Sequence, residues 1–148
     1  MARFERRGLV GRPVAPVFEY LADPANDAGW SGATRAVELT SHGPVVVGST
    51  FRYVARLGGA RLEMRFVITE LVPNRVIAAR TTGGRVRATG RRTVEAAGAQ
   101  TRVTIAGELR VGGVLGRALE PLVNWVGQRQ LRADVARLLE RLDALPTP

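Results

Sequence analysis

Two arginines occupy strand positions at which an apolar side chain is expected. Arg80 shares strand parity with the apolar residues Val76 and Ala78. Arg92 shares it with Val94. A buried guanidinium needs a partner, and inside a cavity a ligand carbonyl, enolate or carboxylate can serve as one. The structural alternatives are a bulge at Gly90 that turns Arg92 outward, or an arginine stem that reaches solvent from a strand end. Their direction therefore decides whether these two residues have a chemical role.

The other polar candidates are less specific. The phenol of Tyr53 can donate a hydrogen bond to a carbonyl, and Gln128 and Arg129 interrupt a C-terminal apolar pattern that faces either a cavity or solvent. The single histidine, His42, lies in a Gly-Pro turn without a cysteine or a second histidine nearby. This arrangement favours neither a metal site nor a Ser-His-Asp triad. We expect no cofactor and no metal, and we assign no catalytic acid or base.

The elements that would position these residues begin with a series of strands. Residues 33–111 form alternating apolar and polar runs separated by glycine and proline, which is typical of consecutive antiparallel strands. Tight turns are expected at Gly58-Gly59, at Pro73-Asn74 and at Gly83-Gly84. With an N-terminal strand near residues 3–10, the pattern predicts seven strands.

The sheet needs a cover because the alternation makes one face apolar and the other rich in arginine. Residues 114–144 provide it, since their apolar positions recur at three and four residues as in a helix. Pro121 should kink this helix or split off its first turn. Two short helices are expected between the first two strands, the second capped by Asp23 and beginning at Pro24.

Composition limits the alternatives. The chain has 148 residues, 45% of them hydrophobic, which suits one domain over residues 1–145 with a frayed tail at 146–148. It has no cysteine, so disulfides and thiolate chemistry are excluded. No apolar run could span a bilayer, and the N-terminus carries charges where a signal peptide is apolar. We therefore expect a soluble cytoplasmic protein.

The net charge of +9 comes entirely from arginine, since the chain has no lysine. Arginine clusters can neutralise nucleic-acid phosphates, but no basic run exceeds two residues and no aromatic platform or helix-turn-helix pattern accompanies them. Nucleic acid is therefore not expected as a partner. The arginine-covered face of the sheet could instead dock an acidic partner or an anionic membrane surface.

Several segments carry a family resemblance. Residues 12–30 contain Val17-Phe18, Asp23-Pro24 and Trp30 in the order of the opening motif of the polyketide cyclase/dehydrase group. This group is part of the START-like (SRPBCC, pollen-allergen-like) superfamily, and the resemblance continues through residues 47–59, residues 66–80 and the final helix. It implies an α+β helix-grip fold, in which a curved seven-stranded antiparallel sheet wraps around a long C-terminal helix with a hydrophobic cavity between them.

The resemblance and the strand parity together predict a ligand-binding set. Its members are Trp30, Phe51, Tyr53, Met64, Phe66, Arg80, Arg92, Leu109, Leu119, Leu122 and Val126. Any one of them could equally be an ordinary core residue.

Three functions remain open. The first is binding of a small hydrophobic molecule resembling a lipid or a polyketide. The second is a polyketide cyclase or aromatase that positions its substrate and polarises a carbonyl with Arg80, Arg92 or Tyr53. The third is docking through the outer face of the sheet. A homodimer is compatible with each of these functions.

Overall fold

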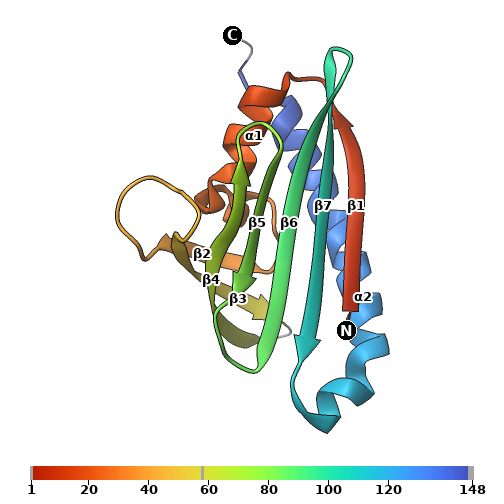
Figure 1. Cartoon of the computed structure of the whole chain (residues 1–148). Helices are drawn as coiled ribbons and strands as arrows, with labels where there is room; N and C mark the ends of the chain where they lie inside the picture. The colour runs from red at the N-terminus through yellow and green to blue at the C-terminus, as the bar shows by residue number, and fades with distance from the viewer. Residues whose placement is uncertain (1, 58, 147–148) are drawn as a thin grey trace.

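The computed structural model describes residues 2–57 and 59–146 (Figure 1). The predicted tight turn at Gly58-Gly59 and the predicted tail at residues 146–148 lie partly outside the described residues. The elements follow in the order β1 (Ala2–Val10), α1 (Val14–Ala22), the 3-10 helix η1 (Pro24–Gly29), β2 (Thr34–Leu39), β3 (Thr50–Leu57), β4 (Ala60–Val72), β5 (Val76–Thr81), β6 (Val86–Ala97), β7 (Gln100–Val111) and α2 (Gly113–Asp143).

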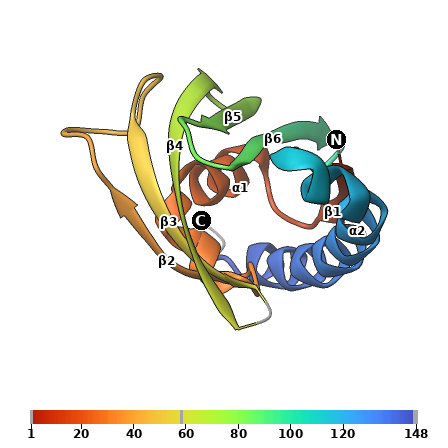
Figure 2. The same ribbon diagram turned by 90° about the horizontal axis from the view of Figure 1, so that it is seen from below.

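All seven strands form one antiparallel sheet in the order β1-β7-β6-β5-β4-β3-β2. Each strand from β2 to β6 pairs with the next strand in sequence, while β1 closes against β7. The sheet curves around α1, η1 and α2, as Figure 2 shows. The helix-grip architecture is therefore confirmed.

Local sequence explains the turns and the two short helices. Gly84 and Asn74 both have positive φ, at 91° and 60°, at the corners predicted from their dipeptides. The Asp23 side chain accepts a hydrogen bond from the backbone N of Ala25 at 3.1 Å, which confirms the predicted cap before Pro24. The chain therefore leaves α1 and enters η1 through a fixed corner.

The long helix packs on β1 and β7 at one side of the sheet. Its second half buries Val135, Leu138 and Leu142 in the main core, together with Val17 and Leu21 of α1. The helix is continuous through the internal proline, so its first turn is not split off. Among the described residues, no helix is long and apolar enough to cross a bilayer.

Candidate functional site

A buried network of three polar side chains joins the sheet to the short helices. Arg92 on β6 donates from Nη1 to Oδ1 of Asp27 at 2.9 Å and from Nη2 to Oδ2 at 2.6 Å. Tyr53 on β3 donates its hydroxyl hydrogen to the same Asp27 Oδ2 at 2.6 Å. Asp27 is only 2% exposed, so this carboxylate is held by protein donors in place of water.

Arg92 also binds the C-terminal end of α1. Its Nη1 donates to the carbonyl oxygen of Leu21 at 2.9 Å, and Leu21 lies in the last turn of α1, where backbone carbonyls lack helical partners. The guanidinium carbon lies 5.3 Å from the ring centroid of Trp30, a cation-π contact. Arg92 thus connects the sheet, α1 and the residue that follows η1.

The network fixes the protonation of two of its members. Burial alone would lower the pKa of Arg92, but the charge of Asp27 and its hydrogen bonds outweigh burial and raise that pKa above its ordinary value. Burial, followed by the charge of Asp27, raises the pKa of Tyr53 above its ordinary value. Arg92 therefore stays charged and Tyr53 stays a neutral phenol.

An apolar cavity of about 230 Å³ lies beside this network. It is lined by residues of η1 and of strands β3 to β6: Pro24, Phe51, Tyr53, Phe66, Ile68, Ile77, Ala78, Ala79, Ala88, Thr89, Gly90 and Arg92. The rings of Tyr53 and Phe66 meet edge to face with centroids 5.0 Å apart, so one aromatic wall carries the phenol.

Four residues of the predicted ligand-binding set lie around this cavity: Phe51, Tyr53, Phe66 and Arg92. The parity assigned to Arg92 is correct, because β6 pairs with β7 without a register shift and Gly90 hosts no bulge. The protein partner of the guanidinium is Asp27, which the sequence analysis did not single out. An arginine on an apolar face requires a counterion, but its residue type and spacing do not say which carboxylate supplies it.

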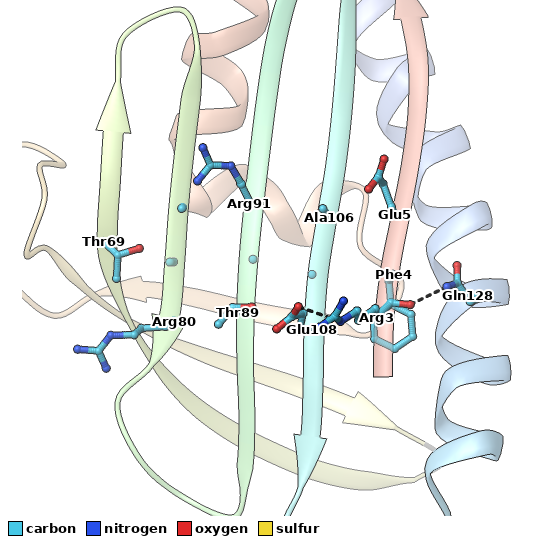
Figure 3. A pocket seen from close by; sticks show the side chains of 14 residues that line it. Arg3, Phe4, Glu5, Thr69, Arg80, Thr89, Arg91, Ala106, Glu108 and Gln128 are labelled. Atoms are coloured by element: carbon cyan, nitrogen blue, oxygen red, sulfur yellow. Dashed lines mark hydrogen bonds and ion pairs between the residues drawn. The ribbon is translucent and has the colours of Figure 1, made fainter. Parts of the chain in front are cut away.

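The prediction for Arg80 is wrong. Ile77 and Ala79 face the core of the sheet, so Arg80 lies on the opposite face, where its side chain is exposed and points away from β5 (Figure 3). The prediction took the apolar residue Val76 as a sign that its side of the strand faces the core. Val76 and Ile77 are both buried although successive strand residues point to opposite faces, and Ile77 is the one on the core face. A buried residue at a strand end does not report the parity of the strand.

The remaining predicted residues lie elsewhere. Trp30 is buried next to Arg92 but is not part of the cavity lining, and Met64 and Leu109 are half-buried outside it. The helix residues Leu119, Leu122 and Val126 are exposed. Within residues 2–57 and 59–146, α2 contributes nothing to the lining of this cavity. The helix packs on β1 and β7, whereas the cavity is lined by β3 to β6.

The weaker polar candidates also lie outside the cavity. Gln128 donates to the backbone oxygen of Arg3 at 2.7 Å, and Arg129 stacks over Trp125 with its guanidinium carbon 5.6 Å from the ring centroid. His42 is exposed. No cluster of three or more metal-binding side chains occurs in the described part of the chain.

The outer face of the sheet has a shallow hollow of about 660 Å³, with Arg3, Arg80, Arg91 and Glu108 around it (Figure 3). Its charges are largely paired: Arg91 lies 2.5 Å from Glu70, and Arg3 lies 3.2 Å from Glu108. The predicted arginine-rich face is therefore a mixed face on which glutamates balance many arginines.

Comparison with known proteins agrees with this architecture. A family model described as polyketide cyclase / dehydrase and lipid transport matches residues 1–143. No curated protein sequence matches the chain significantly.

Solved structures of similar fold include a protein from Thermus thermophilus, with a TM-score of 0.83 and 17% identity over 98% of this chain and 99% of that one. A START superfamily protein from Mycobacterium smegmatis has a TM-score of 0.82 and 12% identity over 99% and 100%. The Zhui aromatase/cyclase from a Streptomyces species has a TM-score of 0.78 and 22% identity over 95% and 93%. These structures share the fold of this chain. Since the family model spans nearly the whole sequence, the chain belongs to the polyketide cyclase / dehydrase and lipid transport family.

Proposed function

We propose that this protein binds a small, uncharged hydrophobic molecule in the cavity between η1 and strands β3 to β6. The observation that carries the proposal is the cavity of about 230 Å³, with Phe51, Phe66 and Ile77 on its apolar walls and Tyr53 and Arg92 at one side. Apolar pockets with a few convergent polar groups are the usual form of a small-molecule site.

The size of the cavity limits the ligand. Pockets for drug-sized ligands have volumes of about 300–1,000 Å³, so this cavity suits a compact molecule or the ring end of a longer one. The aromatic edges of Tyr53 and Phe66 favour a flat aromatic or alicyclic group, which packs well against rings.

The polar side of the cavity favours a neutral ligand. The charge of Arg92 is balanced by Asp27, so the wall offers no unpaired cation to a carboxylate. Tyr53 donates its one hydrogen to Asp27, and the neighbouring Arg92 guanidinium interacts with the phenol oxygen. One lone pair of that oxygen is then left to accept a hydrogen bond from a ligand. A ligand hydroxyl is the group that fits this acceptor.

A cavity-filling variant tests the proposal. A carbon added at Gly90 meets nothing within 4 Å, and its backbone needs no positive φ, so Gly90→Leu should fill the cavity without disturbing the sheet. Gly83→Leu is the matched control, because that glycine also has open space and an ordinary φ but lies in a turn outside the cavity lining.

Calorimetric titration with naphthol and with naphthoate measures the effect. We expect naphthol to bind the wild type and the Gly83→Leu variant, with affinity at least about tenfold lower in Gly90→Leu, and naphthoate to bind more weakly than naphthol. Equal naphthol affinity in Gly90→Leu and wild type would overturn the proposal. So would failure of naphthol and of a wider panel of fatty acids, isoprenoids and aromatic polyketides to bind.

A cyclase activity is the second candidate, favoured by one observation. Arg92 stays charged and Tyr53 stays protonated at the cavity wall. In this reaction the Tyr53 hydroxyl would turn from Asp27 to the substrate carbonyl and stabilise the negative charge that develops there, with the charge of Arg92 close by. Tyr53→Phe removes one such group and leaves the ring in place, so it should change the product profile from a poly-β-keto substrate. An unchanged profile would exclude this role for Tyr53.

A further inference from the structure

We propose that one end of this molecule docks on an anionic lipid bilayer. This end, called the open end below, comprises residues 111–126, which include the first half of α2 with Arg117, and the arginines near the neighbouring strand ends: Arg80, Arg85, Arg87 and Arg110. It lies at the bottom of Figure 1, where the β5–β6 turn and the start of α2 come together. The inference goes beyond the proposed ligand binding and does not depend on it.

The first half of α2 exposes its apolar side chains. Val114 is 86% exposed, Leu115 72% and Trp125 60%, and Leu119, Leu122 and Val126 are exposed as well. Soluble monomers seldom expose a contiguous apolar patch of this kind unless it is an interaction surface.

These apolar side chains are exposed because the first half of α2 contacts the rest of the protein through a different side of the helix. It touches the rest of the protein through its small residues: a carbon added at Gly116 would lie 2.3 Å from the backbone oxygen of Val111, and one added at Gly127 would lie 2.3 Å from the ring of Phe4. Close approach on the glycine side turns the large apolar side chains outward. The first half of α2 is thus an amphipathic helix with its apolar face uncovered.

Two of the arginines near this helix are direct neighbours across the sheet. Arg87 and Arg110 are directly opposite across β6 and β7, a like-charge pair that is unfavourable without an anion. The backbone N of Gly112 donates to the oxygen of Arg85 at 2.9 Å, which holds that turn against the start of α2. Over much of the remaining outer face the arginines instead pair with glutamates, as Arg102 does with Glu95.

Charge complementarity selects the occupant. A second copy of this chain would bring the same arginines together across a twofold interface, because an isologous contact pairs a patch with itself. An anionic bilayer satisfies both features at once, since its headgroups attract the arginines and its acyl boundary accepts Leu115 and Trp125. An exposed tryptophan beside basic residues is typical of a helix lying in that interface.

Vesicle binding tests the proposal. The probe is a vesicle of phosphatidylcholine with an equal part of phosphatidylglycerol, compared with phosphatidylcholine alone, and binding is measured by co-sedimentation and by tryptophan emission. The chain has two tryptophans, and Trp30 is already buried, so a blue shift on binding should come from Trp125 and disappear in Trp125→Phe. We expect binding to the anionic vesicles only, and we expect salt to weaken it.

Two double variants should remove binding. Val114→Ser with Leu115→Ser removes the most exposed apolar pair, and Arg87→Gln with Arg110→Gln removes the like-charge pair. Each should lower the vesicle partition coefficient at least about tenfold. All four side chains lie at the surface or at the end of the sheet, so the thermal midpoint should change little.

The matched controls lie away from the open end. Val46→Ser with Val47→Ser replaces two valines that are 52% and 58% exposed in the loop between β2 and β3, and Arg7→Gln with Arg102→Gln replaces two exposed outer-face arginines. Both control variants should bind vesicles like the wild type.

Any of three results would overturn the proposal: no binding to anionic vesicles, equal losses in test and control variants, or a dimer in solution that Val114→Ser with Leu115→Ser dissociates. Retention of naphthol binding in a protein that ignores vesicles would reject membrane docking while leaving the proposed function intact.

Discussion

The two halves of α2 have similar sequence patterns but differ in burial. In the second half Val135, Leu138 and Leu142 are buried in the main core, whereas in the first half Leu115 and Leu122 are exposed. Both halves repeat apolar residues at helical spacing. Periodicity therefore reports that a helix has an apolar side, and only the surrounding elements decide whether that side is covered.

The second half is also tied down by polar contacts. The backbone N of Gly32 donates to Oδ1 of Asp134 at 3.0 Å, and Nε of Arg137 donates to the oxygen of Trp30 at 3.0 Å. These bonds fasten the segment after η1 to the helix, close to the Asp27–Arg92 network. The molecule thus has a closed part, containing that network and the second half of α2, and an open end.

The largest expected effect lies in the closed part. Asp27→Ala leaves the Arg92 guanidinium buried without its counterion, and it should lower the free energy of unfolding by about 3–5 kcal/mol in urea titration. Replacing both residues by leucine should recover much of this loss, because no charge is then left unpaired. At the open end Arg110→Ala should change stability by no more than about 0.5 kcal/mol. Equal effects of Asp27→Ala and Arg110→Ala would contradict the distinction.

A matched pair of leucines compares the two halves of α2 directly. Leu138→Ala removes a fully buried side chain and should cost about 2–5 kcal/mol, while Leu122→Ala removes an exposed one and should cost at most about 0.5 kcal/mol. Urea titration of the two variants measures both. A large loss for Leu122→Ala would show that the first half of α2 is packed in solution.

Loss of the hydrogen bond between Gly32 and Asp134, called the polar anchor of the second half of α2, should have a smaller effect on stability. Asp134→Ala leaves the backbone N of Gly32 without its side-chain acceptor and should cost about 1–3 kcal/mol. Gln128→Ala removes an exposed hydrogen bond to Arg3 and should cost less than about 1 kcal/mol. If the two variants were equally stable, the anchor would have no role in holding the helix.

A pH titration of stability gives the smallest effect. Because burial and then Asp27 raise the pKa of Tyr53 in the folded state, the unfolded chain loses this proton first as the pH rises above the ordinary value of 10.0. The contribution of the protonated Tyr53 to the free energy of unfolding is therefore complete below that pH. Above it, this contribution declines by up to about 1.4 kcal/mol for each pH unit. Tyr53→Phe should therefore lose less stability than the wild type between pH of about 10 and about 11. Parallel profiles would contradict the burial of this phenol.

Much of the fold could be predicted from the sequence because alternation and turn residues are local signals. The seven strands, the corner at Asp23-Pro24 and the inward direction of Arg92 all follow from such signals. Arg80 was misplaced because Val76, at a strand end, is buried whatever its parity. The exposure of Leu119 and Leu122 could not be predicted, since it depends on the close contacts that α2 makes through Gly116 and Gly127.

The site was only partly predictable for a related reason. Side-chain parity placed Phe51, Tyr53 and Phe66 on the inner face correctly. The pairing of Arg92 with Asp27 joins residues 65 positions apart, and no local pattern reports such a contact. The need for a counterion was readable from the sequence, but the identity of that counterion required the fold.

The central claim is that the cavity beside the Asp27–Arg92 network, and not the exposed half of α2, receives the ligand. Titration of isotope-labelled protein with naphthol, followed by two-dimensional NMR, tests it most directly. The account predicts the largest chemical-shift changes at Phe51, Tyr53, Phe66 and Ile77, with little change at Leu115 or Leu122. Changes confined to the first half of α2, or to the outer face around Arg80 and Arg91, would contradict it.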